Sequence, residues 1–241
     1  MRTVAIVALV AIAAVNAHSA LAEGPQLAPY IADYDVKYGS MSVGTSRTEL
    51  RRAPTPGQWL IESRSNASGL ARLIAGGTLV QRSTFEVEAD GMRPLSYRFD
   101  DGSKRSEKDV TLDFDWGSGR VQGVSEGEPV DIAAETGLQD AASMQAYVLL
   151  CLSGGVEPGL VPMIEKDKIK YYRYTFLRRE RLKTALGELD TLVYRSARDG
   201  KPRETLSWYA PSLGNVSVRA EQREDGKRLF QTYIKRYRPG S

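Results

Sequence analysis

A serine flanked by glycines is the first feature of this chain that could do chemistry. Residues 123–127 read Gly-Val-Ser-Glu-Gly, which matches the spacing of the nucleophile elbow in hydrolases. That chemistry needs Ser125 on a tight strand-to-helix turn and a histidine that accepts its proton. Here the flanking residues predict strands, and the only histidine, His18, lies in the N-terminal segment. We therefore interpret the match as a coincidence and assign no catalytic residue.

The single cysteine, Cys151, is the second potential nucleophile. It falls near the end of an apolar segment, where a thiol usually behaves as a small hydrophobe. A reactive thiolate needs a basic or cationic neighbour, and no histidine follows His18. One cysteine also excludes an internal disulfide and a cluster of His and Cys metal ligands. We expect Cys151 to pack in the core, and we expect no metal and no cofactor.

Two pairs of carboxylates, Asp33 with Asp35 and Asp113 with Asp115, lie two residues apart. On a strand, this spacing puts both members of a pair on one face. There they could serve glycoside hydrolysis or hold a hard cation. The same spacing is usual for the solvated face of a strand, and no calcium-loop pattern is present. A hydrolase that acts on cell-wall polymers is therefore the weakest of three hypotheses.

A basic segment, residues 165–183, holds eight basic and three acidic residues interleaved with aromatic residues. As a strand it places Lys168, Lys170, Tyr172 and Tyr174 on one face. Such a face could bind nucleic acid, but the predicted export of the chain argues against that partner. Lipid headgroups are the natural anionic partners in the cell envelope. The alternative is a solvated strand face whose charges prevent edge-to-edge pairing.

The elements that would position these residues are mainly strands, because apolar and polar residues alternate with a period of two. The alternating runs are residues 30–38, 85–88, 95–100, 110–116, 168–182, 189–197, 203–209, 216–221 and 228–237. Asp-Gly pairs such as Asp199-Gly200 and Asp225-Gly226 separate runs and favour tight hairpins. The pattern predicts a mainly β fold, a curved antiparallel sheet of ten or more strands that forms a barrel, half-barrel or spiral.

One amphipathic helix is predicted over residues 138–152, where apolar residues recur at helical spacing. Thr136 and Gln139 could form a capping box at its start, and Gly154-Gly155 ends it. The curved sheet would wrap around this helix and bury its apolar face. Residues 70–74 predict a short second helix or a flap. Residues 153–162, rich in Gly and Pro, would join the helix to the second section of the sheet.

The N-terminal 22 residues read as a cleavable signal peptide. Arg2 precedes an apolar run over residues 4–15, which is too short to span a bilayer. Ala20-Leu21-Ala22 matches a cleavage site, and a rival site follows Ala17. We expect residues 23–241 to form a single β-rich periplasmic domain with no transmembrane segment. That domain lacks histidine, so no side chain has an ordinary pKa near neutrality.

Two segments in the second half carry a resemblance to a known family. Residues 182–191 read Leu-Lys-Thr-Ala-Leu-Gly-Glu-Leu-Asp-Thr, and residues 204–213 read Glu-Thr-Leu-Ser-Trp-Tyr-Ala-Pro-Ser-Leu. Together with residues 30–44, 114–116 and 138–144, they resemble a bacterial exported family catalogued as domain of unknown function 3108. Ser217-Val218 stands where that family commonly has Pro-Val. The resemblance implies a periplasmic β-rich domain with no established activity, so no catalytic residue is carried over.

The leading hypothesis is a non-enzymatic envelope protein that binds an apolar or amphiphilic ligand inside its curved sheet. The residues expected to line that space are Tyr34, Val36, Tyr38, Val110, Leu112, Phe114 and Trp116. The alternative for these side chains is a filled core. The second hypothesis is a protein-interaction module that docks an envelope partner through the basic strand face or the turn at residues 208–211.

Overall fold

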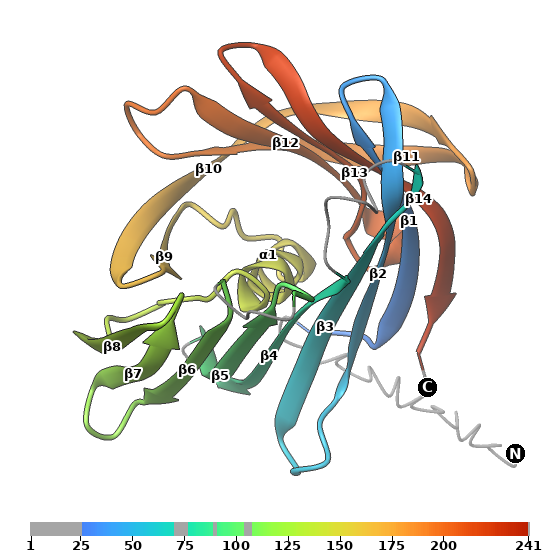
Figure 1. The fold of residues 1–241 in the computed structure, drawn as a ribbon. Helices are drawn as coiled ribbons and strands as arrows, with labels where there is room; N and C mark the ends of the chain where they lie inside the picture. Colours follow the sequence, from blue (N-terminus) through green and yellow to red (C-terminus); the bar gives the residue numbers. More distant parts are fainter. Residues whose placement is uncertain (1–25, 70–76, 89–90, 104–107, 241) are drawn as a thin grey trace, which may run out of the picture.

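The computed structural model of the chain describes residues 26–69, 77–88, 91–103 and 108–240 (Figure 1). The predicted signal peptide and the predicted helix or flap at residues 70–74 lie outside these residues. No helix within the described ranges is long and apolar enough to cross a membrane.

Most of the described chain forms one sheet of fourteen strands with a single α-helix beside it (Figure 1). The strands are β1 (Tyr30–Tyr38), β2 (Met41–Arg52), β3 (Gln58–Ala67), β4 (Thr78–Glu88), β5 (Gly91–Asp100), β6 (Val110–Asp115), β7 (Arg120–Ser125), β8 (Glu128–Ala133), β9 (Leu160–Glu165), β10 (Lys168–Thr184), β11 (Gly187–Ala197), β12 (Arg203–Ala210), β13 (Val216–Glu224) and β14 (Lys227–Pro239). The helix α1 (Ser143–Ser153) follows β8, and one 3-10 turn, η2 (Pro211–Leu213), follows β12.

The strand order runs from β8 down to β1 and then from β14 down to β9. All neighbouring strands are antiparallel, and β1 joins the two halves by pairing with both β2 and β14. The predicted curved antiparallel sheet with one helix is confirmed, and the sheet is open: β8 and β9 are its edges. Each edge strand contains a proline, Pro129 or Pro162, which cannot donate a hydrogen bond to a further strand.

Tight hairpins explain why the strands follow one another around the sheet. At the β13–β14 turn, Asp225 and Gly226 both have positive φ, at 49° and 74°. This is the geometry that a two-residue type I′ hairpin needs, and Asp-Gly is its preferred sequence. Glu126 and Gly127, in the turn between β7 and β8, also have positive φ, at 53° and 84°.

The helix α1 begins five residues later than the periodicity indicates. The Asp140 Oδ1 accepts hydrogen bonds from the backbone N–H groups of Ala142 and Ser143, both at 2.8 Å. The Ser143 hydroxyl in turn accepts the backbone N–H of Asp140 at 2.9 Å. The predicted capping pair, Thr136 and Gln139, was therefore wrong. The side chains of Asp140 and Ser143 each accept the backbone N–H of the other residue, which is the reciprocal pattern of a capping box.

The gap between the two sheet edges is bridged by contacts outside the ladder. Gln139 forms a parallel bridge with β9, where its N–H donates to the Pro162 carbonyl at 2.9 Å. The Lys166 ammonium lies 2.6 Å from the Glu126 carboxylate. The Tyr171 hydroxyl donates to Glu135 at 2.9 Å. The strands β8 and β9 therefore do not pair with each other, but these contacts connect the two edges of the sheet.

The helix lies between the two halves of the curved sheet (Figure 1). Ala146, Leu149 and Leu150 of α1 belong to the large buried cluster that the sheet encloses. Val148 packs instead with Tyr194 of β11 and Tyr209 of β12. Burial of both sides of the helix holds it in place, since its own short length gives it little stability alone.

Candidate ligand-binding cavity

A cavity of about 420 Å³ lies between α1 and the concave side of β9–β13. Its lining residues are Ala141, Met144, Gln145, Val148, Met163, Tyr172, Tyr174, Ser196, Thr205, Ser207, Tyr209 and Gln222. The volume falls within the range of about 300–1,000 Å³ that is usual for small-molecule sites. The space is therefore large enough for a ligand and is shared by five strands and one helix.

The strand β12 shows how the sheet supplies its part of the lining. Thr205, Ser207 and Tyr209 alternate with Leu206 and Trp208, so the two sets point to opposite faces. All three residues of the first set line the cavity, whereas Leu206 and Trp208 are buried on the other face. The hydroxyl-bearing set thus forms a continuous row on the concave face.

Neighbouring strands extend this row through their register. Ser196 of β11 lies opposite Thr205, and Gln222 of β13 lies opposite Thr205 on its other side. Directly opposed residues share a face in an antiparallel sheet. The concave floor is therefore rich in hydroxyl and amide groups, while α1 and β9 contribute the apolar side chains of Met144, Val148 and Met163.

The tyrosines of the lining are neutral. Burial raises the pKa of Tyr209 to about 12, and burial also raises the pKa of Tyr174 far above its usual value. Both hydroxyls therefore keep their protons at physiological pH and can donate or accept hydrogen bonds. Among the described residues that line the cavity, none carries a formal charge.

Charged groups beside the cavity are paired with one another around Glu165. Its carboxylate accepts a hydrogen bond from the Tyr172 hydroxyl and one from the Lys170 ammonium at 2.6 Å. Arg198 lies 3.9 Å away. Burial alone would raise the pKa of Glu165, but the hydrogen bonds from Lys170 and Tyr172 outweigh it and lower the pKa. This network fixes the orientation of Tyr172.

The residues of the predicted basic strand face have different surroundings in the structure. Tyr172 and Tyr174 line the cavity. Lys170 pairs with Glu165, and Lys168 is exposed at the start of β10. The alternation along β10 places these residues as expected, but the aromatic members lie against a cavity and not on an open surface.

The predicted apolar row on β6 lies elsewhere, in the main buried cluster. Leu112 and Phe114 are buried, and Val110 packs against the same cluster. The rings of Phe114 and Trp116 stack at 6.3 Å, and the Trp116 indole donates to the Pro94 carbonyl at 2.6 Å. None of these residues lines the cavity beside α1.

The predicted residues of β1 are also separate from that cavity. The Tyr34 hydroxyl donates to the Ser217 carbonyl at 2.9 Å, and Val36 is half-buried. Tyr38 is exposed at the end of the strand. These three side chains share a face of β1 but not a described pocket.

The serine motif owes its glycines to the hairpin between β7 and β8. A side chain at Gly123 would place its Cβ 1.9 Å from the Thr111 carbonyl on β6. Gly127 has a positive φ in the turn. Ser125 is buried at the end of β7, with a strand and not a helix after it. The two glycines of the motif are therefore explained by the close approach of β6 and by the hairpin turn, and not by a catalytic role for Ser125.

The other reactive side chains have structural surroundings. Burial raises the pKa of the Cys151 thiol. The paired carboxylates form these contacts: Asp33 with Arg47 at 2.6 Å, Asp35 with Lys235 at 3.2 Å, Asp113 with Arg98 at 2.7 Å, and Asp115 with the Ser118 hydroxyl at 2.7 Å. The hypothesis that the turn at residues 208–211 docks a partner was wrong for Trp208 and Tyr209, which are buried.

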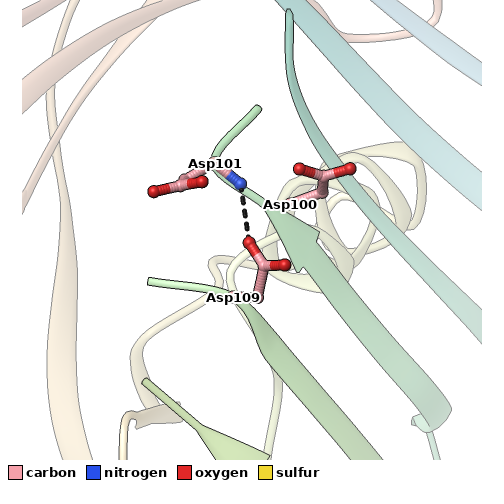
Figure 2. Close-up of side chains that lie close together, drawn as sticks. All are labelled: Asp100, Asp101 and Asp109. Carbon is pink, nitrogen blue, oxygen red and sulfur yellow. Dashed lines mark hydrogen bonds between the residues drawn. The ribbon is translucent and has the colours of Figure 1, made fainter. Parts of the chain in front are cut away.

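Three carboxylates that the sequence did not single out meet where β5 ends and β6 begins (Figure 2). Ligand oxygens of Asp100, Asp101 and Asp109 lie within 4.8 Å of one another. Asp109 accepts the backbone N–H of Asp101 at 3.0 Å, and Asp100 accepts that of Gly102 at 2.7 Å. These bonds shape the turn, which accounts for the cluster without a ligand.

The cavity itself was missed from the sequence because its floor looks like a solvated strand face. Ser, Thr and Gln at alternate positions usually face water. The one available signal was the opposite set on β12, Leu206 and Trp208, which is as apolar as a core face. With Leu206 and Trp208 buried on one face, the polar face of β12 lies against α1 and not against water.

Comparison with one solved structure supports the fold. A β-barrel-like protein of domain of unknown function DUF1849 from Brucella abortus has a TM-score of 0.59 at 12% identity, covering 90% of this chain and 100% of that chain. A protein from Bacteroides fragilis described as exported, with a YmcC-like fold, has a TM-score of 0.39 at 10% identity, covering 89% and 98%. No curated protein matches the chain. The model of the family described as protein of unknown function (DUF3108) matches residues 33–228, and the chain therefore belongs to that family.

Proposed function

We propose that this chain is an exported, non-enzymatic protein that binds a neutral amphiphilic molecule in the cavity between α1 and β9–β13. The observation that carries the proposal is the composition of the lining. One wall comes from α1 and β9 and is mainly apolar, with Gln145 as its polar member, and the other is a floor of hydroxyl and amide groups from β10–β13. A molecule with an apolar side and a hydroxylated side matches both walls at once.

The absence of charge from the described lining favours a neutral ligand over a fatty acid. A buried carboxylate without a cationic partner is costly. Lys170 and Arg198, which lie beside the lining residue Tyr172, are already engaged with Glu165. The flexible thioethers of Met144 and Met163 would adapt to an alkyl chain, while Ser207 and Thr205 offer both donors and acceptors to a hydroxylated head.

A binding role is also favoured by the state of the possible nucleophiles. Burial raises the pKa of Cys151, which keeps the thiol protonated. Ser125 ends a strand in a hairpin. Export is supported by the sequence of residues 1–22. N-terminal sequencing of the exported chain should begin at Glu23, and a chain that begins at Met1 would contradict cleavage.

The ligand proposal is tested with n-octyl β-D-glucoside below its micellar concentration, titrated calorimetrically. We expect saturable binding, and we expect decanoate to bind at least tenfold more weakly. Ser207→Leu fills the floor of the cavity and should reduce glucoside binding at least tenfold. Ser212→Leu, on the exposed surface of η2, is the matched control and should leave binding unchanged. Equal binding by both variants would overturn the proposal.

A further inference from the structure

Three large apolar side chains are exposed together at one corner of the sheet. Tyr38 is 45% exposed, Met41 is 63% exposed and Phe230 is 48% exposed. Tyr38 lies directly opposite Met41 on β2 and directly opposite Phe230 on β14. The rings of Tyr38 and Phe230 meet edge to face with centroids 5.1 Å apart. We call these three residues the apolar corner.

The apolar corner is held in place by the backbone. The Gly39 N–H donates to the Leu229 carbonyl at 2.9 Å, and the Gln231 amide donates to the Gly39 carbonyl at 2.7 Å. The β1–β2 turn is therefore fastened to β14. In Figure 1 the β1–β2 and β13–β14 turns both lie at the top, away from the C-terminus. The three side chains thus project from a fixed end of the molecule.

The surroundings of the apolar corner are basic. Residues 36–44 and 226–232 contain Lys37, Lys227 and Arg228 and no acidic residue. The Glu221 carboxylate, near Arg228 at 3.4 Å, is shared with Arg219 and Arg223. Three guanidinium groups therefore face one carboxylate, which leaves an excess of positive charge at this end of β13 and β14. This cluster lies on the opposite face of the sheet from Phe230, because Glu221 pairs with Gln231, whose side chain alternates with that of Phe230.

The two nearest acidic residues along β13–β14 reduce this excess only in part. Glu224 pairs with Arg203 at 3.2 Å, and Asp225 lies in the turn. Positive charge around exposed aromatic and thioether groups is complementary to an anionic lipid surface, where aromatic rings occupy the headgroup boundary. We propose that the apolar corner, with its basic flanks, docks onto the surface of an anionic lipid bilayer.

Docking would bring the cavity close to the membrane. The register between β13 and β14 shifts between Glu221 and Arg223, so Gln222 lies opposite both Leu229 and Phe230. Gln222 also lines the cavity. The apolar corner therefore adjoins the cavity floor, and an amphiphile leaving the bilayer would meet Gln222 first. This step, unlike the docking itself, rests on the proposed function.

The test is co-sedimentation of the exported, purified chain with vesicles of phosphatidylglycerol and phosphatidylcholine. We expect binding to mixed vesicles, little binding to pure phosphatidylcholine, and a decrease as salt rises. The combined variant Tyr38→Ser, Met41→Ser and Phe230→Ser should lose at least tenfold in partitioning. The matched control replaces three exposed apolar residues elsewhere, Val124, Val156 and Leu177, by serine, and should bind as the parent does.

A second readout locates the contact. Phe230→Trp should show a blue shift of tryptophan emission on mixed vesicles, and the parent, whose three Trp lie elsewhere, should not. Equal vesicle binding by the combined and control variants would overturn the proposal. So would a dimer that the combined variant dissociates, because a second copy would then cover the apolar corner. Octyl glucoside titration of the same variants tests the cavity separately.

Discussion

The Ser83 hydroxyl on β4 donates a hydrogen bond of 2.6 Å to the Asp140 carboxylate, 57 residues later in the chain. The other oxygen of Asp140 caps α1 through Ala142 and Ser143. One buried carboxylate therefore joins the first half of the sheet to the helix that forms a wall of the cavity. Burial raises the pKa of Asp140 to about 6, although its hydrogen bonds from Ser83 and the helix oppose the rise.

Replacing Asp140 with asparagine should change how stability depends on pH. Between about pH 4 and 6 the folded carboxyl keeps a proton that the unfolded chain has released, so its contribution to the free energy of unfolding falls as pH rises. A shift of two units corresponds to about 3 kcal/mol. Urea unfolding from pH 4 to 7 should show the Asp140→Asn variant gaining up to that amount relative to the parent.

The control for this measurement is Asp113→Asn, an exposed carboxylate on β6. It removes the same charge without altering a buried site, and its difference from the parent should stay within about 0.5 kcal/mol across the range. A difference between parent and Asp140→Asn that does not vary with pH would show that the carboxyl titrates normally. Asp140→Ala, which also removes the cap, should cost about 1–2 kcal/mol.

A second prediction tests whether the apolar side chains of β6 fill the core or border an open space. Phe114 is buried against Trp116, so Phe114→Ala should lower the free energy of unfolding by about 3–5 kcal/mol. Val124→Ala, on the exposed side of β7, should change it by less than about 0.5 kcal/mol. Urea denaturation measures both. A cost near 1 kcal/mol for Phe114→Ala would indicate that the residue borders open space, as the ligand-wall hypothesis required.

The sheet could be predicted because its signals are local. Asp225-Gly226 specifies its hairpin through the positive φ of both residues, and the alternation of β6, β10 and β12 is visible within single strands. The alternation does not mark strands β2, β3, β7, β8 and β9. Polar residues occupy buried positions in three of them, namely Thr48 of β2, Ser63 of β3 and Ser125 of β7. Pro129 and Pro162 interrupt the other two.

The cavity could not be predicted, for a different physical reason. Its walls come from Met144 on α1, Met163 on β9 and Gln222 on β13, which only the order of strands brings together. The start of α1 also depends on a long-range contact, because Ser83 helps to hold Asp140 where it caps the helix. Periodicity reports which face of an element is apolar, but not which distant element covers it.

The last prediction concerns Glu221, whose side chain is buried although it carries a charge. Its partners are the guanidinium groups of Arg219, Arg223 and Arg228, and the Arg219 guanidinium also lies 4.6 Å from the centre of the Trp208 ring. Removing the carboxylate would leave three cations facing one another in a partly buried site. Glu221→Gln keeps the shape and should lower the free energy of unfolding by about 2–4 kcal/mol at pH 7, somewhat less than for a fully buried pair because the arginines retain some contact with water.

The pH dependence of this loss gives an independent check. Burial alone would raise the pKa of Glu221, but the hydrogen bonds from Arg223 and Arg219 outweigh it and lower the pKa. A lowered pKa means that the carboxylate stabilises the fold above the unfolded value and that this stabilisation is lost as pH falls through the folded value. The gap between parent and Glu221→Gln should therefore narrow below about pH 4.5. Glu224→Gln, which breaks an exposed pair with Arg203, should cost less than about 1 kcal/mol. Equal costs for the two variants would mean that burial adds nothing to the Glu221 cluster.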